Sequence, residues 1–373
     1  MDKIKMVDLH GQYHRIKPEI DEAIERVIES TSFIQGTEVE LFESALSKYI
    51  GVDHTICCAN GTDALQIAMM ALNFEPGDEI ILPVHTYVAT AEVISLLRLT
   101  PVFVDVDEQT FLIDINQIED KITRRTKAIV PVHLYGQCAD MEPILSIASK
   151  YGLLVIEDAA QSIGAEYTFS DSTKEQAGTI GNVGTTSFFP SKNLGCFGDG
   201  GAIFTKYNEL AEKLRMIANH GQRVKYHHEI VGVNSRLDTL QAAILSVKLK
   251  HLNEYVLKRR AVAAYYDANL PKDLLQVPFR SINSTHVFHQ YTVKVDVSIR
   301  ERLQQFLLTS GIPTMIYYPI PLHLQSAYIT EGNPGQFPVT EKLSKSVLSL
   351  PIHTEMTEEQ LTYIVSKISE FAG

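Results

Sequence analysis

A single lysine, Lys192, lies in a glycine-rich stretch between two predicted strands, 183–189 and 201–205. Glycines permit tight turns and close backbone approach, so this stretch is predicted to be a loop built around a bound group. The nearby apolar side chains are Phe188, Phe189, Leu194 and Phe197. An ammonium group among apolar side chains loses hydration, which lowers its pKa toward the value that a nucleophilic amine needs. Lys192 is therefore a candidate for binding a carbonyl group; the alternative is a surface lysine on a hairpin.

A candidate phosphate site precedes this lysine in the chain. The residues Asn60-Gly61-Thr62-Asp63 follow one predicted strand, 55–59, and open a predicted helix, 62–72. The free N–H groups and the dipole of a helix N-terminus favour an anion such as a phosphate. The alternative is a simple N-cap, for which Asn60 or Thr62 would suffice.

Two further side chains of chemical interest lie at strand ends. Asp158 ends the predicted strand 153–158, and Tyr87 follows the predicted strand 79–83. Taken singly, such a carboxylate is commonly a helix cap and such a tyrosine commonly packs in the core. Together with Lys192 and the phosphate site, they supply what pyridoxal phosphate needs: an amine, an acidic partner for the ring nitrogen, an aromatic face and a phosphate anchor.

The elements that must position these groups alternate between strand and helix. Apolar runs predict strands over 55–59, 79–83, 100–106, 127–134, 153–158, 183–189 and 201–205. Helical periodicity predicts helices over 62–72, 141–151 and 208–219. Continuous apolar strands that alternate with helices indicate an α/β fold with a mostly parallel sheet between helices. Ligands of such sheets gather at the carboxyl ends of the strands, where the candidate residues lie.

Helices are also predicted before and after this region. Residues 16–30 place apolar side chains on one helical face, and Thr37-x-x-Glu40 has the spacing of a capping box at the start of a second helix. A long helix is predicted over 237–269. The segments that follow predict a strand (290–296), a helix (299–308), a strand (314–318), a loop (331–338) and a helix (358–371). We therefore expect a large cofactor-binding domain over 1–250, with an N-terminal helical segment, and a smaller α+β domain over 251–373.

The composition narrows the class of protein. The 373 residues are 45% hydrophobic and 21% charged, with a net charge of −12. No run of basic residues indicates nucleic-acid binding, and no apolar stretch has the length of a membrane span. The four cysteines form no C-x-x-C pair, which favours a reduced, cytoplasmic setting.

Two other cofactor chemistries find little support in the sequence. Gly178-x-x-Gly181-x-x-Gly184 lacks the G-x-G-x-x-G spacing that binds dinucleotides. His227-His228 has no nearby cluster of ligands, so a surface loop is the better interpretation and no metal site is predicted.

The chain resembles the DegT/StrS family of sugar-nucleotide aminotransferases, which belongs to the aspartate-aminotransferase-like class of pyridoxal-phosphate-dependent transferases. The resemblance covers nearly the whole chain. The segments that carry it are Ala59-Asn-Gly-Thr-Asp-Ala-Leu65, His85-Thr-Tyr-Val-Ala-Thr90, Ile156-Glu-Asp-Ala-Ala-Gln161, Ser187-Phe-Phe-Pro-Ser-Lys192, Gly198-Asp-Gly-Gly-Ala202 and Gly232-Val-Asn-Ser-Arg-Leu-Asp-Thr-Leu-Gln241.

The resemblance implies a role for each matching residue. Lys192 would form the Schiff base with pyridoxal 5'-phosphate, and Asp158 would pair with the pyridine nitrogen. Gln161 would lie near the ring hydroxyl and Tyr87 would stack on the ring. The residues implied around the phosphate are Gly61, Thr62, Asp63 and Ser187. Asn234 would reach the phosphate from a neighbouring subunit, so a homodimer with shared active sites is implied.

Within the family, the chain looks most like the branch that acts on UDP-2-acetamido-2-deoxy-3-oxo-glucuronate. That branch makes 2,3-diamino sugars for surface polysaccharides such as O-antigen and capsule, and L-glutamate would donate the amine and leave pyridoxamine 5'-phosphate. The implied substrate residues are Thr31, Phe33, Ser191, Arg236, Tyr317 and Tyr318. Thr31-Ser32-Phe33 and Tyr317-Tyr318 replace the Gly-x-Tyr and His-Tyr of the branch, so the particular sugar stays open.

Several alternatives to this substrate assignment stay open. A dTDP- or UDP-linked 3-keto or 4-keto 6-deoxy sugar is the main one. A pyridoxal-phosphate-dependent dehydratase is disfavoured because such relatives usually replace the lysine. A non-catalytic regulator would normally carry an added DNA-binding module, for which this chain has no spare residues.

Overall fold

The computed structural model describes residues 3–328 and 333–372. Part of the predicted 331–338 loop lies outside these residues. A seven-stranded sheet forms the centre of the molecule, in the order β1-β9-β8-β5-β4-β2-β3. Its strands are β1 (His54–Cys58), β9 (Gly201–Thr205), β8 (Val183–Ser187), β5 (Leu154–Asp158), β4 (Thr126–Ile129), β2 (Glu79–Pro83) and β3 (Thr100–Val104).

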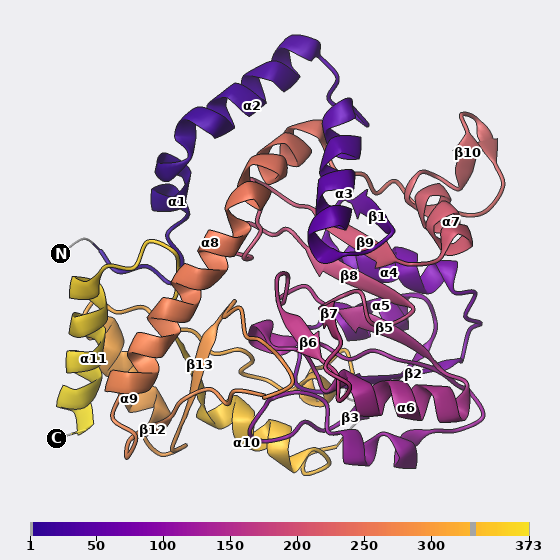
Figure 1. The fold of residues 1–373 in the computed structure, drawn as a ribbon. Helices are drawn as coiled ribbons and strands as arrows, with labels where there is room; N and C mark the ends of the chain where they lie inside the picture. Colours follow the sequence, from indigo (N-terminus) through magenta and orange to yellow (C-terminus); the bar gives the residue numbers. More distant parts are fainter. Residues whose placement is uncertain (1–2, 329–332, 373) are drawn as a thin grey trace.

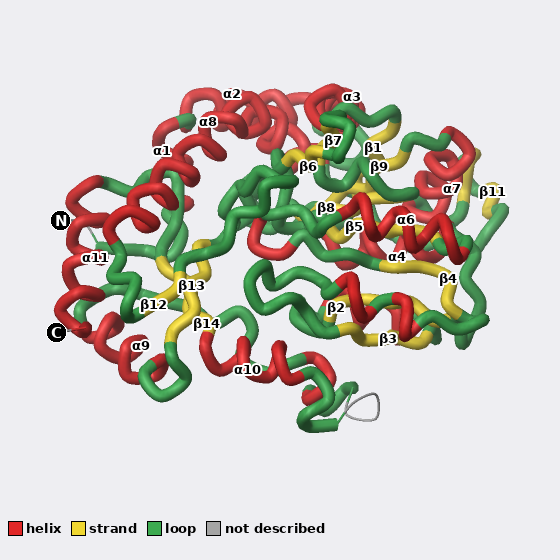
Figure 2. The backbone as a smooth tube through the Cα atoms, turned by 60° about the horizontal axis from the view of Figure 1, so that its bottom comes forward, coloured by secondary structure: helices red, strands yellow, loops and turns green. Residues whose placement is uncertain are grey.

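The strand directions confirm the predicted fold class. β1 and β8 both pair antiparallel with β9, whereas the pairs β8–β5, β5–β4, β4–β2 and β2–β3 are parallel. β9 therefore runs against the other strands of an otherwise parallel sheet. Figure 2 shows the strands of this sheet in yellow among the red helices. Buried strands of this kind read as continuous apolar runs, which is why the sequence located them.

Helices cover both faces of this sheet. One apolar core joins it to α3 (Thr37–Ile50), α6 (Met141–Tyr151) and α8 (Thr239–Asn269). A second core, on the other face, joins it to α4 (Gly61–Ala71), α5 (Ala89–Leu96) and α7 (Asn208–Ala218). All four cysteines are buried and free.

A smaller, antiparallel sheet lies at the C-terminal end of α8 (Figure 1). Its strands are β12 (Leu275–Gln276), β13 (Tyr291–Val295) and β14 (Val347–Leu350), and the helices around it are α9 (Arg300–Thr309), α10 (Pro338–Ser346) and α11 (Glu358–Ala372). The strand predicted over 314–318 is wrong: this segment forms only one bridge, from Met315 to Ser349, and β14 takes the place beside β13. The domain boundary at residue 250 falls inside α8 and stays a prediction.

The N-terminal helices lie against α8. α1 (Leu9–Arg15) leads into α2 (Lys17–Ser30), whose Ile20 and Val27 pack on Ala243 and Val247. The capping box predicted at Thr37 is wrong, because Gly36 is the N-cap of α3 and makes no side-chain cap. The N–H of Gly36 instead donates to Thr239 Oγ1 over 3.1 Å, which joins α3 to the start of α8.

Two small hairpins complete the described part of the chain. They consist of β6 (Glu166–Thr168) with β7 (Lys174–Gln176), and β10 (Gln222–Val224) with β11 (His227–His228). None of the helices in the described residues combines the length and the hydropathy of a membrane span.

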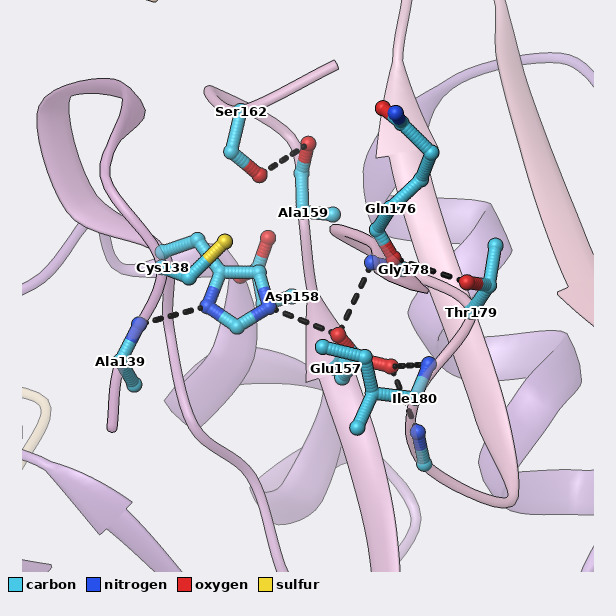
Figure 3. Close-up of polar contacts among 12 residues, drawn as sticks. Cys138, Ala139, Glu157, Asp158, Ala159, Ser162, Gln176, Gly178, Thr179 and Ile180 are labelled. Carbon is cyan, nitrogen blue, oxygen red and sulfur yellow. Dashed lines mark hydrogen bonds and ion pairs between the residues drawn. The ribbon is translucent and has the colours of Figure 1, made fainter. Parts of the chain in front are cut away.

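A buried carboxylate in the middle of the large sheet fixes the strand that carries Asp158. Glu157 Oε1 accepts from the N–H groups of Ile180 and Gly181, both over 2.6 Å. Its Oε2 accepts from the N–H of Gly178 over 2.9 Å and from His133 Nε2 over 2.8 Å. Figure 3 shows these backbone donors gathered around the Glu157 side chain. The glycine-rich turn 178–181 is thus a nest of N–H groups for an internal anion.

The same contacts determine which ring nitrogen of His133 carries the proton. His133 Nδ1 accepts from the N–H of Ala139 over 3.0 Å, so the ring proton lies on Nε2 and points to Glu157. Both side chains are fully buried. Glu157 therefore joins β5 to the turn 178–181 and to the segment that follows β4.

Replacing Glu157 with glutamine is expected to lower the free energy of unfolding by about 2–3 kcal/mol, because the amide puts an NH2 group against buried donors and leaves them unpaired. Urea denaturation followed by circular dichroism measures this loss. Glu25→Gln is the control: Glu25 is exposed on α2 and its side chain forms no hydrogen bond within the described residues, so its change should stay within about 0.5 kcal/mol. Equal stability of the two variants would contradict the prediction.

Candidate active site

The ends of the parallel strands bring the predicted site residues to one edge of the sheet. β8 ends at Ser187 and β5 ends at Asp158, and the two strands are neighbours. β1 ends beside the first residue of β9, Gly201, which also pairs with Ser187. The loops that follow β1, β2, β5 and β8 therefore open on the same side.

The helix α4 begins at the predicted phosphate site. Asn60 Oδ1 accepts from the N–H of Asp63 over 2.8 Å and caps the helix. The N–H groups of Gly61 and Thr62 have no partner within the described residues, so the N-cap and the anion site are compatible. A Cβ on Gly61 would lie 2.7 Å from Ser187 Cβ, and only glycine permits this approach of the helix to β8.

Asp158 is a buried carboxylate with room for one more partner. It is 7% exposed. Thr90 Oγ1, on α5, donates to its Oδ2 over 2.8 Å, and the N–H of Ala160 donates to its Oδ1 over 3.2 Å. It does not cap a helix, which was the alternative interpretation.

Lys192 lies in the loop after β8, as predicted, but with fewer apolar neighbours than its sequence suggests. Phe188 and Leu194 are fully buried, whereas Phe189 and Phe197 are 52% and 41% exposed. Burial lowers the pKa of the Lys192 ammonium to about 8, and the Asp158 charge opposes this shift. At pH 7 about a tenth of the amine is therefore uncharged, far more than for a lysine with the usual pKa.

A second lysine, which sequence reasoning missed, holds this loop. Lys248 on α8 is 1% exposed, and its Nζ donates to the carbonyl of Gly195 over 2.6 Å. Asn193 Nδ2 donates to the carbonyl of Val287 over 2.9 Å and ties the loop to a second segment. Burial also lowers the pKa of Lys248 to about 8. In sequence, Lys248 is one more polar residue of an amphipathic helix and carries no signal.

An aromatic wall stands on the other side of Asp158. Tyr87 is 57% exposed and its ring lies 6.0 Å from that of Tyr318. Gln161 Nε2 donates to the Tyr318 hydroxyl over 3.2 Å, and Gln161 Oε1 accepts from the N–H of Tyr135 over 2.7 Å. The Tyr135 hydroxyl donates to the carbonyl of Tyr317. Tyr135 therefore connects the large sheet to the segment 317–318.

Four predicted site residues lie apart from this group. Thr31, Phe33, Asn234 and Arg236 make no described contact with Lys192 or Asp158. They are near one another, because the carbonyl of Phe33 accepts from the N–H of Thr239 over 3.0 Å and Ile34 pairs with Asp238. Arg236 forms no ion pair with Asp238, and with Glu43 and Arg215 it lines a cavity of about 650 Å³ between α3 and α7.

The remaining predicted substrate residues lie near Lys192. Ser191 and Tyr317 line a cavity of about 330 Å³ on the side of the N-terminal segment. Across residues 3–328 and 333–372, no three His, Cys, Asp or Glu side chains gather as a metal site would require.

Curated relatives cover almost the entire chain. The UDP-2-acetamido-2-deoxy-3-oxo-D-glucuronate aminotransferase of Pseudomonas aeruginosa is 49% identical over 366 residues, 98% of this chain and 99% of that relative. A pleiotropic regulatory protein of Geobacillus stearothermophilus is 48% identical over 372 residues, 99% of this chain and 98% of that relative.

Solved structures match as completely. DesV of S. venezuelae, in complex with a ketimine intermediate, has a TM-score of 0.94 and 40% identity and covers 100% of this chain and 99% of its own. NtdA of Bacillus subtilis, with bound cofactor PMP, has a TM-score of 0.91 and 34% identity and covers 99% of this chain and 85% of its own. The predicted fold, that of a pyridoxal-phosphate-dependent transferase, is confirmed by such matches.

The profile of one family spans residues 14–369. It confirms the resemblance that the motifs between Ala59 and Gln241 carry. The chain belongs to the DegT/DnrJ/EryC1/StrS aminotransferase family.

Proposed function

We propose that this chain is a pyridoxal-phosphate-dependent aminotransferase that moves an amino group from L-glutamate to a nucleotide-linked 3-keto sugar. The observation that carries the proposal is the placement of Asp158 at the end of β5 and of Lys192 in the loop after its parallel neighbour β8, on the side where α4 begins. Family membership and the PMP-bound relative support the cofactor.

The residues present fit this cofactor. The free N–H groups of Gly61 and Thr62, with Ser187 beside them, suit a phosphate. Asp158 suits a protonated pyridine nitrogen, because a buried carboxylate favours a nearby positive charge. The exposed face of Tyr87 suits a stacked ring. When bound, pyridoxal phosphate supplies an electron sink for the carbanion that forms when the substrate loses a proton.

The chain's own chemistry centres on Lys192 Nζ. Its lowered pKa makes it a nucleophile toward a carbonyl at neutral pH. Once a substrate amine has taken its place on the cofactor, the freed Lys192 Nζ can act as a general base that accepts a proton from the substrate carbon. It can then act as a general acid and give this proton up in the next step. Asp158 would stabilise a positive charge on the ring nitrogen of the bound cofactor.

The preferred sugar is UDP-2-acetamido-2-deoxy-3-oxo-D-glucuronate, which the relative from Pseudomonas aeruginosa supports. Ser191, Tyr317 and Tyr318 would line its site from the same subunit. We also propose that the amino sugar is used to make surface polysaccharide, including lipopolysaccharide, and that the protein is cytoplasmic. dTDP-linked and 4-keto sugars are its alternatives.

Thr31, Phe33, Asn234 and Arg236 would act on the active site of a partner subunit. Their lack of described contacts with Lys192 and Asp158 supports this, as does the exposure of the preceding segment, in which Tyr226 and Val231 are 79% and 85% exposed. Arg236 has no described carboxylate partner and could hold a substrate carboxylate or diphosphate with two parallel hydrogen bonds. A homodimer with two shared sites follows.

A regulatory role without catalysis is the second candidate, which the name of the relative from Geobacillus stearothermophilus favours. Such a role needs neither Lys192 nor the acidic partner of the ring. The presence of both, with Asp158 near enough for its charge to raise the pKa of Lys192, favours the enzyme.

Lys192 is expected to carry the cofactor. Borohydride reduction of the loaded protein, followed by peptide mapping, should place the pyridoxyl group on Lys192, and Lys192→Ala should bind pyridoxamine phosphate without turnover. The rate at which the apoprotein captures the cofactor should rise with pH up to about 8, where Lys192 becomes uncharged, and then level off. A label on Lys248, the other buried lysine with a pKa near 8, would contradict the assignment.

Replacing Asp158 with asparagine is expected to lower the rate of both half-reactions about 10²–10³-fold, because the ring nitrogen loses the charge that keeps it protonated. Single-turnover absorbance measurements with glutamate follow the first half-reaction. Asp53→Asn, at an exposed position, is the control and should react as the wild type does. Near-normal rates in Asp158→Asn would mean that another group pairs with the ring.

Mixing Lys192→Ala with Asn234→Ala chains is expected to restore activity. If Asn234 acts on the partner's site, one of the two sites in each heterodimer keeps both residues. Refolded mixtures, shown by mass spectrometry to contain heterodimer, should approach a quarter of the wild-type rate at equal mixing, since about half the dimers are mixed and each has one intact site. Mixtures no more active than either parent would count against shared sites.

A further inference from the structure

The cavity of about 330 Å³ next to Ser191 contains two polar residues without an assigned role. Its apolar wall comes from the N-terminal segment 6–9 and from Leu350 and Ile352, and its polar wall from Ser191, Tyr317, His289 and Gln290. Ser191 precedes Lys192, and the Lys192 charge acts on His289, so the cavity lies near this lysine.

Two members of this wall are unusual: Gln290, whose Oε1 is buried without a partner, and His289. His289 is 7% exposed, and its Nδ1 is buried without any hydrogen-bond partner. Its Nε2 forms no hydrogen bond within the described residues either. His286, three residues earlier and also buried, is satisfied, because its Nδ1 accepts from the N–H of Phe288 over 3.0 Å. Since buried polar groups almost always have partners, the His289 ring indicates a ligand that completes it.

The surroundings of His289 are cationic. Arg259 on α8 is 2% exposed and has no carboxylate partner within the described residues. Its Nη1 donates to the carbonyls of Phe288 (2.9 Å), His289 (3.2 Å) and Ile352 (3.2 Å), which places a buried positive charge behind two walls of the cavity. Lys192 supplies a second positive charge nearby. Burial, Lys192 and Arg259, in that order, hold the pKa of His289 well below its usual range.

Asp158 partly offsets the charge of Lys192, but no carboxylate in the described residues pairs with Arg259. Asp8, on the N-terminal segment, already accepts from Lys5 Nζ over 2.7 Å and from the N–H of Gly11 over 3.0 Å. No carboxylate is among the groups that shift the pKa of His289. Buried charges normally have a partner of opposite sign, so the buried Arg259 indicates that an anion is missing beside it.

We propose that this cavity is a carboxylate-binding subsite, in which His289 takes up a proton and, with the Ser191 hydroxyl, holds a substrate carboxylate. The inference rests on the proposed function, because it assigns the cavity to a substrate of that reaction. The carboxylate comes either from the amino donor or from the uronate of the sugar. Aliphatic residues on the opposite wall would contact the carbon chain that bears it.

The proposal predicts that binding is coupled to proton uptake. A carboxylate beside His289 favours the charged imidazolium and raises the pKa of this histidine. The free protein has His289 neutral near pH 7, so binding of a carboxylate between about pH 6 and 7.5 must take a proton from the solvent.

Titration calorimetry on the pyridoxal-phosphate-loaded enzyme tests this without turnover. The probes are 2-oxoglutarate, for the donor carboxylate, and UDP-glucuronate against UDP-glucose, for the uronate. Measurements in two buffers with different ionisation enthalpies give the number of protons taken up. We expect uptake on binding of one carboxylate probe, and a loss of at least about tenfold in its affinity, together with the uptake, in His289→Asn.

The outcomes separate the two sources. Weaker binding of 2-oxoglutarate alone assigns the subsite to the donor. A reduced preference for UDP-glucuronate over UDP-glucose assigns it to the sugar. Binding without proton uptake in the wild type, binding of neither carboxylate probe, or unchanged affinities in His289→Asn would overturn the proposal.

Two controls keep the test specific. His286→Asn changes a buried histidine of the same segment outside the cavity and should leave probe affinity unchanged. His289→Gln places an amide in a different position and should also abolish proton uptake. Thermal melting and the borohydride label on Lys192 establish that each variant is folded and loaded, so a failure of the cofactor assignment is seen separately from a failure of the subsite.

Discussion

The hydrogen bonds that Glu157 accepts are the constraint on which the site depends. β5 ends in two consecutive carboxylates, and alternation along a strand sends them to opposite faces of the sheet. Glu157 is saturated by three backbone N–H groups and His133, whereas Asp158 keeps only two donors. One carboxylate is thus committed to holding the strand, and its neighbour is left able to bind a further positive charge. Both carboxylates are buried in one strand, so the charge of Glu157 has to be satisfied within the protein. Because its four donors do this, Asp158 alone is left to pair with a bound group.

A second constraint acts on Lys192, whose amine must be both reactive and close to a carboxylate. Burial disfavours its charged form and Asp158 favours it, and burial is the larger effect. Lys248 and Asn193 hold the loop from two sides without touching the amine, through Gly195 and Val287. The amine therefore keeps its freedom to move a proton while its backbone is fixed, which suits a group that must bind, leave and return.

The sequence located the groups whose position follows from local chemistry. Lys192, Asp158 and the 60–63 turn each follow an apolar strand, and the strand direction places them on one edge. Contacts between distant segments could not be located in this way. The segment 314–318 has the composition of a strand, yet β14 outcompetes it for β13. The turn 178–181 lacks a dinucleotide spacing, and nothing in the sequence says that its N–H groups bind Glu157. Lys248 and His289 could not be singled out from the sequence, because only their burial in the fold distinguishes them from other polar residues.

The division of the predicted substrate residues into two groups has a physical consequence. Within one chain, the candidate cofactor site, the aromatic wall and the cavity lined by His289 lie near Lys192. Arg236 lines a different cavity, on another part of the surface. In the proposed function, the nucleotide-linked keto sugar and the amino acid both carry negative charge and would react in turn at the same amine. If His289 holds one carboxylate from within the subunit and Arg236 holds the other anion from the partner, the two substrates can share Lys192 without sharing every charge contact. The enzyme would then distinguish the two substrates by the cation that binds each of them, His289 or Arg236. The affinity for one substrate could therefore change without a change in the affinity for the other.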